Sequence, residues 1–399
     1  MAFWLLTIVS VATHFLTTYG AVKSPIVIVP GLAGSRIDAR LNKTTVPHEL
    51  CDKTSDWYPL WVNIEDLIPY VIECWVANMK LVYDRETGNW TDPAGVYTRI
   101  PGFGNTSTIE YLDPSLNEVG AYFNVFVSEM AKEGYVPGES IRGAPYDWRF
   151  TPVDRPEYFT QLRLLIEDTY KTNGNRKVTL VAHSLGCLQT LYFLNDVVAD
   201  SWKSLYVASF IPIAGPWAGA ANSMRGYASG YNLKIPILSA HDMRPVQRSA
   251  PSSAWLMPTP RDWSSEPIVV TSTKNYTVND YEAFFADIDF PIGFDVWKNV
   301  SNVTQSLAFP DVTLHCIYGA NVSTVAQVVY AAGDFPNGDP TSLYGNGDGT
   351  VNEESLVLCN NWKGDASHDV TTRIFPNINH FDMVSDLSVI DYVKTIVLS

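Results

Sequence analysis

The sequence predicts an α/β protein with a mostly parallel sheet and helices on both of its faces. Short β-branched runs recur along the 399 residues, and helical patterns alternate with them. Strands that alternate with helices are typical of parallel sheets. Hydrophobic residues make up 46% of the chain and charged residues 17%. That proportion supports a large core and excludes a disordered or fibrous protein.

The elements are expected in the order that such a sheet requires. Buried strands are predicted at 26–29, 178–182, 206–213, 312–318 and 373–378, and helices at 118–133, 187–198 and 386–397. The stretches 48–110 and 216–300 interrupt this order and are rich in Pro, Trp and Tyr. We interpret them as a cap and a lid inserted into one domain that spans 21–399. A separate second domain is the alternative.

The N-terminus indicates a secretory route. An apolar stretch at 3–12 is too short to span a bilayer and is followed by small residues near Gly20, so residues 1–20 are predicted to be a cleaved signal peptide. An uncleaved anchor is the alternative. Glycosylation is expected at the Asn-X-Ser/Thr sites. These sites are Asn42, Asn89, Asn105, Asn275, Asn299, Asn302 and Asn321.

The charge balance limits the partners. The chain has 27 Lys and Arg against 42 Asp and Glu, a net charge of −15. Nucleic-acid binding depends on cationic side chains, so we expect no nucleic-acid partner. Anionic membranes should repel the chain at neutral pH. Aromatic residues reach 13%, which suits a protein that handles apolar ligands.

Residues 182–186, Ala-His-Ser-Leu-Gly, predict a nucleophile at Ser184. They match the G-x-S-x-G elbow with Ala in the first position, and they lie between a predicted strand and a predicted helix. The elbow is a sharp, strained turn, so its neighbours must be small. The alternative is an ordinary turn with a solvated serine.

A serine hydroxyl needs a base, and hydrolases with this elbow supply an acid and then a histidine downstream. His380 follows the last predicted strand, where a loop can hold an imidazole over the edge of the sheet, and His368 is the alternative. Asp348 is the preferred acid because glycines flank it and permit a tight turn. Asp334 and Asp339 are less favoured.

The oxyanion of an acyl-transfer reaction needs two backbone N–H donors. We assign them to Leu185, which follows the nucleophile, and to Leu32, in the loop after the first strand. No spacing typical of a metal site occurs, so neither a metal nor a cofactor is expected.

The cysteines indicate local disulfides. The spacing suggests the pairs Cys51–Cys74 and Cys316–Cys359 and leaves Cys187 unpaired, although spacing alone does not determine connectivity.

Several longer motifs carry a resemblance to a known family. They are found at 28–31, 99–104, 142–149, 181–186, 214–219 and 347–352. With these motifs the chain from about residue 25 to its end resembles the lecithin:cholesterol acyltransferase family, and within it the lysosomal phospholipase A2 branch.

The resemblance implies an α/β-hydrolase core with a membrane-binding cap and a mobile lid. It implies the triad Ser184, Asp348 and His380 and the same two disulfides. It further implies a lysosomal or secreted phospholipase that forms an acyl-serine and passes the acyl group to water or to a lipid alcohol such as ceramide. The alternatives are acyl transfer to a sterol and a lipid-binding or transfer protein without activity.

The segment between Cys51 and Cys74 predicts contact with a lipid surface. The aromatic and aliphatic side chains expected there are Trp57, Trp61, Leu67 and Ile68. Such residues suit a membrane or a lipoprotein surface. A packed insertion is the alternative. We expect a monomer.

Overall fold

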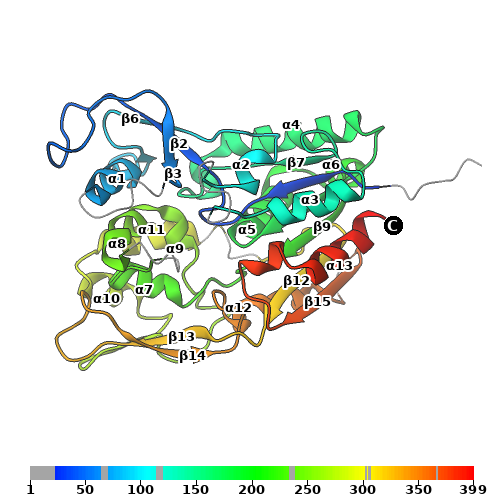
Figure 1. Ribbon diagram of the computed structural model, residues 1–399. Helices are drawn as coiled ribbons and strands as arrows, with labels where there is room; N and C mark the ends of the chain where they lie inside the picture. The colour runs from blue at the N-terminus through cyan, green and yellow to red at the C-terminus, as the bar shows by residue number, and fades with distance from the viewer. Residues whose placement is uncertain are drawn as a thin grey trace, which may run out of the picture.

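The computed structural model has a central sheet of six parallel strands (Figure 1). The structure describes residues 23–63, 71–113, 120–232, 239–301, 303, 307–364 and 367–399. The strand order is β15-β12-β9-β8-β1-β7. The bounds are Ile26–Val29 for β1, Ile141–Gly143 for β7, Val178–His183 for β8, Val207–Ile213 for β9, Leu314–Ala320 for β12 and Val370–Pro376 for β15.

Strands β1 and β8 are interior strands of the sheet, and every residue of both is buried. Their runs of Val, Ile, Leu and Ala fit strands that are covered on both faces. The covering helices are α3 (Asn124–Lys132), α4 (Pro156–Thr172), α5 (Leu185–Tyr192), α6 (Asp200–Tyr206) and α13 (Leu387–Val397). Helices α3 and α13 pack against each other, and α4 contacts α6 (Figure 1).

The predicted strands and helices are found with small shifts at their ends. The helix expected at 118–133 begins at Asn124, because Ala121 forms a bridge with Tyr111 just before it. The helix expected at 187–198 begins at Leu185 and ends its regular part at Tyr192. The predicted signal peptide at 1–20 lies outside the described residues.

Residues from the first predicted insertion build a small unit beside the carboxyl ends of the strands (Figure 1). We call it the cap. Its elements are β3 (Tyr58–Trp61), α1 (Ile72–Met79), β4 (Val82–Tyr83), β5 (Trp90–Thr91), β6 (Val96–Arg99) and α2 (Ser107–Glu110). Strand β2 (Ile37–Leu41) precedes the insertion and pairs with both β3 and β6.

The second insertion lies below the cap in Figure 1. Its elements are α7 (Asn222–Ala228), α8 (Ala240–Ser249), α9 (Pro251–Trp255), β10 (Val269–Val270), β11 (Asn275–Tyr276), α10 (Tyr281–Asp287) and α11 (Ile292–Ser301). Strand β10 pairs with β13 (Thr324–Val329), and β13 pairs with β14 (Thr341–Gly345). A second sheet therefore joins this insertion to the loop that follows β14.

Candidate active site

Ser184 occupies the sharp turn between β8 and α5. Its φ is 55° and its ψ is −127°, a conformation that a residue with a side chain rarely adopts. A Cβ at Gly186 would lie 2.4 Å from the carbonyl oxygen of Pro30, so only glycine fits there. The Ser184 N–H donates to the carbonyl of Ile213 at 2.9 Å, which fixes the turn to the next strand.

His380 lies in the loop after β15, and its side chain joins Ser184 to Asp348. Its Nε2 is 2.9 Å from the Ser184 Oγ, and its Nδ1 is 2.7 Å from Oδ2 of Asp348. His380 is 2% exposed and Asp348 is fully buried. His380 thus lies within hydrogen-bonding distance of both other predicted catalytic side chains, although 32 residues separate the acid from the histidine and 196 separate the histidine from the serine.

Backbone groups hold Asp348 in the loop after β14. Its Oδ1 accepts hydrogen bonds from the N–H groups of Thr350 at 3.0 Å and Val351 at 2.8 Å. Its own carbonyl oxygen accepts the N–H of His380 at 2.8 Å. Oδ2 is therefore left to face the imidazole, the arrangement that fixes the tautomer of a general base.

The less favoured candidates lie elsewhere. His368 is exposed and pairs with Asp311 at 3.3 Å. Asp334 and Asp339 are exposed in the loop before β14. His315, another histidine downstream of Ser184, belongs to β12, where its Nδ1 lies 2.8 Å from the Thr371 hydroxyl.

The two predicted oxyanion donors flank the nucleophile. Leu185 is the first residue of α5, where a backbone N–H has no partner within the helix. Leu32 lines the same cavity as Ser184. The preceding Gly31 packs so closely that a Cβ there would lie 2.8 Å from the Cβ of Ser184.

An apolar cavity of about 110 Å³ opens at Ser184. Pockets that bind small ligands usually hold roughly 300–1,000 Å³, so this one is too small for a lipid chain. Its lining includes Leu32, Trp148, Tyr227, Met243, Val246, Ala250 and Leu256. Met243 and Val246 belong to α8, so this helix forms part of the cavity wall.

Two arginines hold α8 in place through backbone carbonyls. Arg244 Nη1 donates to Ala228 at 3.0 Å, and Arg248 donates to Tyr227 at 2.8 Å and to Ile288 at 3.2 Å. Burial, followed by the charge of the neighbouring Arg244, lowers the pKa of Arg248 to about 10. The guanidinium groups bind the last carbonyls of α7, where the helix dipole is negative.

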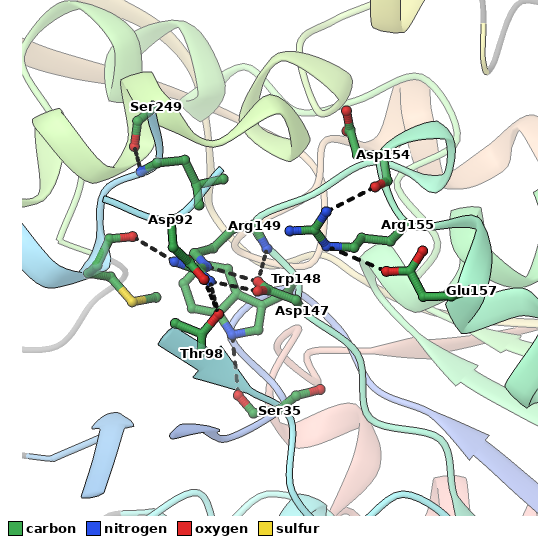
Figure 2. A network of polar contacts seen from close by, with 12 residues as sticks. Ser35, Asp92, Thr98, Asp147, Trp148, Arg149, Asp154, Arg155, Glu157 and Ser249 are labelled. Atoms are coloured by element: carbon green, nitrogen blue, oxygen red, sulfur yellow. Dashed lines mark hydrogen bonds and ion pairs between the residues drawn. The ribbon is translucent and has the colours of Figure 1, made fainter. Parts of the chain in front are cut away.

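Two neutral side chains of α8 add to this attachment. Gln247 exchanges hydrogen bonds with the backbone of Tyr231, at 3.0 Å to the N–H and 2.6 Å to the carbonyl. Ser249 accepts the N–H of Leu81, a residue of the cap, at 3.0 Å (Figure 2). The helix is therefore bonded to the neighbouring elements by side chains.

A buried charge cluster joins the cap to the core. Figure 2 shows Arg149 between Asp147, which follows β7, and Asp92 of the cap. The guanidinium is fully buried and lies 2.6 Å from Asp147 and 3.0 Å from Asp92. It also donates to the carbonyl of Met79 at 3.0 Å and to the hydroxyl of Thr98 at 3.2 Å. The sequence did not identify this role of Arg149, since three of these partners lie at least 51 residues away.

Of the predicted lipid contacts that the structure describes, one is buried and one is partly exposed. Trp61 is 2% exposed and its Nε1 donates to the carbonyl of Ala33 at 2.7 Å, so the prediction that it faces a membrane is wrong. Its ring packs on Trp75 and Trp148 instead. Trp57 is 38% exposed. The predicted contacts Leu67 and Ile68 lie outside the described residues.

One of the two predicted disulfides is formed. Cys51 and Cys74 are bonded, and their sulfurs are within 3.8 Å of His48, so this group offers no thiolate to a metal. Cys316 and Cys359 are free buried thiols, which corrects the predicted second bond. Burial, followed by the neighbouring Cys359, raises the pKa of Cys316.

Six of the seven predicted glycosylation sites are described, and all six asparagines are exposed. They are Asn42, Asn89, Asn105, Asn275, Asn299 and Asn321. Asn302 lies outside the described residues. Among the described residues, no helix is both long and apolar enough to cross a bilayer.

Comparison with known proteins identifies the family. The family model described as lecithin:cholesterol acyltransferase matches residues 57–306 and 295–387. The chain belongs to this family. It is 42% identical to the lysosomal phospholipase A and acyltransferase of Canis lupus familiaris over 94% of this chain and 92% of the relative. It is 41% identical to the protein of that name from Homo sapiens over 94% of this chain and 90% of the relative.

A second group within the family is less similar. The phosphatidylcholine-sterol acyltransferase of Gallus gallus is 36% identical over 90% of this chain and 87% of the relative. The structure in the Tle4–Tli4 complex has a TM-score of 0.55 at 12% identity and covers 94% of this chain and 98% of the other. This likeness agrees with the predicted α/β-hydrolase fold.

Proposed function

We propose that this enzyme is a serine-dependent phospholipase A and acyltransferase, with Ser184 as nucleophile, His380 as base and Asp348 as the acid that orients it. The observation that carries the proposal is the continuous hydrogen-bonded row of these three side chains at the mouth of an apolar cavity. The names of the curated relatives support the same reaction.

In the first step the Ser184 Oγ attacks the ester carbonyl of a glycerophospholipid, and its proton passes to Nε2 of His380. The N–H groups of Leu32 and Leu185 stabilise the oxyanion. The bond to the lysophospholipid oxygen then breaks, and that oxygen takes the proton from His380. An acyl-Ser184 remains.

In the second step water or a lipid alcohol gives its proton to His380 and attacks the acyl carbon. The ester bond to Ser184 breaks, and the proton returns to Oγ. The product is a fatty acid when water attacks and a new ester when the alcohol attacks. A ceramide-type primary alcohol is the acceptor we favour, because the more similar relatives are the lysosomal proteins.

Access to Ser184 requires α8 to move. The cavity of about 110 Å³ cannot hold an acyl chain, and α8 forms part of its wall. Opening would admit the lipid, and reclosure would exclude water during acyl transfer. We therefore assign the lid to α8.

The cap is the surface that we propose docks on a membrane or a lipoprotein. Trp57 is partly exposed, and the guanidinium groups of Arg99 and Arg40 lie 4.3 and 5.5 Å from its ring centroid. Arg99 also pairs with Asp38 at 2.9 Å. A partly exposed tryptophan beside guanidinium groups suits a lipid–water interface. We further propose a lysosomal or secreted location and a monomeric enzyme.

Product analysis on mixed liposomes tests the function. Labelled phosphatidylcholine is offered with ceramide or with cholesterol, and free fatty acid, acylceramide and cholesteryl ester are quantified. We expect fatty acid and acylceramide from the wild type and neither from Ser184→Ala. The matched control is Ser209→Ala, because Ser209 is buried in β9 and bonds to Thr179. Cholesteryl ester as the main product would establish the sterol alternative. Hydrolysis by Ser184→Ala would overturn the triad.

A further inference from the structure

Two side chains, the half-buried Tyr122 and the buried His183, bridge the three loops that surround Ser184. The N–H of Gly31 donates to the Tyr122 hydroxyl at 3.0 Å. That hydroxyl lies 2.5 Å from Nδ1 of His183, and Nε2 of His183 lies 3.0 Å from the carbonyl oxygen of His380. We call this row of contacts the Tyr122–His183 bridge.

The direction of each hydrogen bond in the bridge follows from the groups at its two ends. A carbonyl oxygen only accepts, so Nε2 of His183 carries the proton. In a neutral imidazole Nδ1 is then the acceptor, and the Tyr122 hydroxyl donates to it. The Tyr122 oxygen still has a lone pair for the Gly31 N–H. Every polar group of the bridge is therefore paired in one consistent arrangement.

Burial favours the neutral form of His183. The residue is 1% exposed, and burial followed by the charge of the neighbouring His380 lowers the pKa of His183 well below its ordinary value. The titratable groups around the bridge are Tyr122, His380, Cys187 and Tyr146, and burial raises the pKa of Tyr122, Cys187 and Tyr146. The Asp348 carboxylate is bonded to His380 and not to His183.

The bridge reaches each part of the proposed machinery through the backbone. Gly31 immediately precedes Leu32 and packs against Ser184. His183 immediately precedes Ser184 and holds the carbonyl of His380. A displacement of about 1 Å in such a group can cost about 100-fold in rate.

We infer that Tyr122 and His183 are positioning residues, which hold the Gly31–Leu32 loop and the backbone of His380 in register around Ser184. The inference rests on the roles proposed above for Ser184, Leu32 and His380. Neither side chain touches the substrate in this assignment, so each acts through the residues that it holds.

Deleting one hydroxyl tests the inference. We expect Tyr122→Phe to lower kcat about 10- to 100-fold and to change KM by less than about 2-fold, because the oxyanion donors lose alignment while the lipid-binding surfaces remain. The matched control is Tyr146→Phe, since Tyr146 is more deeply buried than the half-buried Tyr122 and its hydroxyl has no hydrogen-bond partner in the described part of the chain. Equal kcat values for the two variants would overturn the inference.

A second readout separates positioning from folding. A soluble fluorophosphonate that reacts with Ser184 should label Tyr122→Phe more slowly than Tyr146→Phe at a temperature where both are folded by circular dichroism. Labelling at the wild-type rate would contradict the role. If Ser184→Ala is inactive while Tyr122→Phe matches the wild type, the bridge fails and the proposed triad stands; if Ser184→Ala stays active, the triad itself fails.

The tautomer of His183 can be measured in the wild type. Histidine-labelled protein gives ¹⁵N signals that distinguish Nε2–H, Nδ1–H and imidazolium, and His183→Gln identifies the signals of His183. We expect neutral Nε2–H at pH 6.5 and above, because burial lowers the folded-state pKa well below the ordinary value of about 6.5. The Nδ1–H tautomer or an imidazolium in this range would overturn the bridge. In the double variant that combines His183→Gln with Tyr122→Phe, the fold-reduction in kcat should be smaller than the product of the fold-reductions in the two single variants.

Discussion

The loops of the proposed triad and α8, the proposed lid, border the same cavity, but different kinds of bonds hold them. Backbone N–H groups fix the carboxylate of Asp348 and the turn at Ser184. Side chains hold α8, above all Arg244 and Arg248 through carbonyls at the end of α7.

This difference suits the two tasks. Backbone positions follow from strand register and cannot shift alone, so they give the alignment that proton transfer requires. Contacts from long side chains to carbonyls can break one at a time without unfolding the domain, as opening of a lid requires. Substitutions on each side of the cavity should therefore have different signatures.

The largest effect is expected on the catalytic side. Asp348→Asn should lower kcat about 10⁴-fold, because an amide favours the wrong tautomer of His380 and cannot stabilise its charged form. Thermal unfolding should change little by comparison. The control is Asp339→Asn, at an exposed candidate acid that lies outside the triad. A reduction of less than about 10-fold would show that Asp348 is not the acid.

The buried ion pairs of Arg149, which join the cap to the core, are a third case. Here side chains form the attachment, but burial fixes their positions. Arg149→Met leaves Asp92 and Asp147 without their shared partner and should lower the free energy of unfolding by about 3–5 kcal/mol. Chemical denaturation measures this. Arg163→Met is the control, because Arg163 is 54% exposed and its pair with Glu167 lies at the surface. Similar losses in both variants would show that burial of the pair does not matter.

A smaller effect is expected at the lid. Arg248→Gln removes the hydrogen bonds to Tyr227 and Ile288 and should raise hydrolysis of a soluble short-chain ester about 2- to 5-fold, because α8 opens more often. Lys298→Gln provides a charge-matched control at an exposed position of α11. A lower rate with an unchanged KM would show that Arg248 helps to align the catalytic residues and does not restrain the lid.

The sequence predicted most of what depends on local pattern. The elbow at Ser184 lies between a strand and a helix, and His380 follows the last strand, so both could be found from their neighbours in the chain. The choice of Asp348 relied on its flanking glycines. The contacts that link these loops could not be found, because Tyr122 meets Gly31 and His183 across 91 and 61 residues.

The error at Trp61 has the same origin. The pattern around it indicates apolar and aromatic side chains but not which face of β3 is covered. In the structure Trp75 of α1 and Trp148 after β7 cover Trp61, whereas Trp57, just before the strand, stays partly exposed. Burial was decided by the packing of the cap on the core, which no local pattern contains.

The smallest effect is expected at the exposed surface of the cap, which belongs neither to the catalytic loops nor to the contacts that hold α8. Trp57→Ser should weaken binding to vesicles of phosphatidylcholine and anionic lipid about 3- to 10-fold at pH 5, because the indole no longer enters the interface. Tyr344→Ser is the control, since Tyr344 is 63% exposed on β14, outside the cap. Equal binding by Trp57→Ser and the wild type in vesicle sedimentation would move the docking surface away from Trp57.

Binding of the wild type should also strengthen from pH 7 to pH 5, because carboxylates begin to be protonated and histidines gain charge on a chain of net charge −15. Binding that is unchanged by pH would show that charge repulsion does not limit docking.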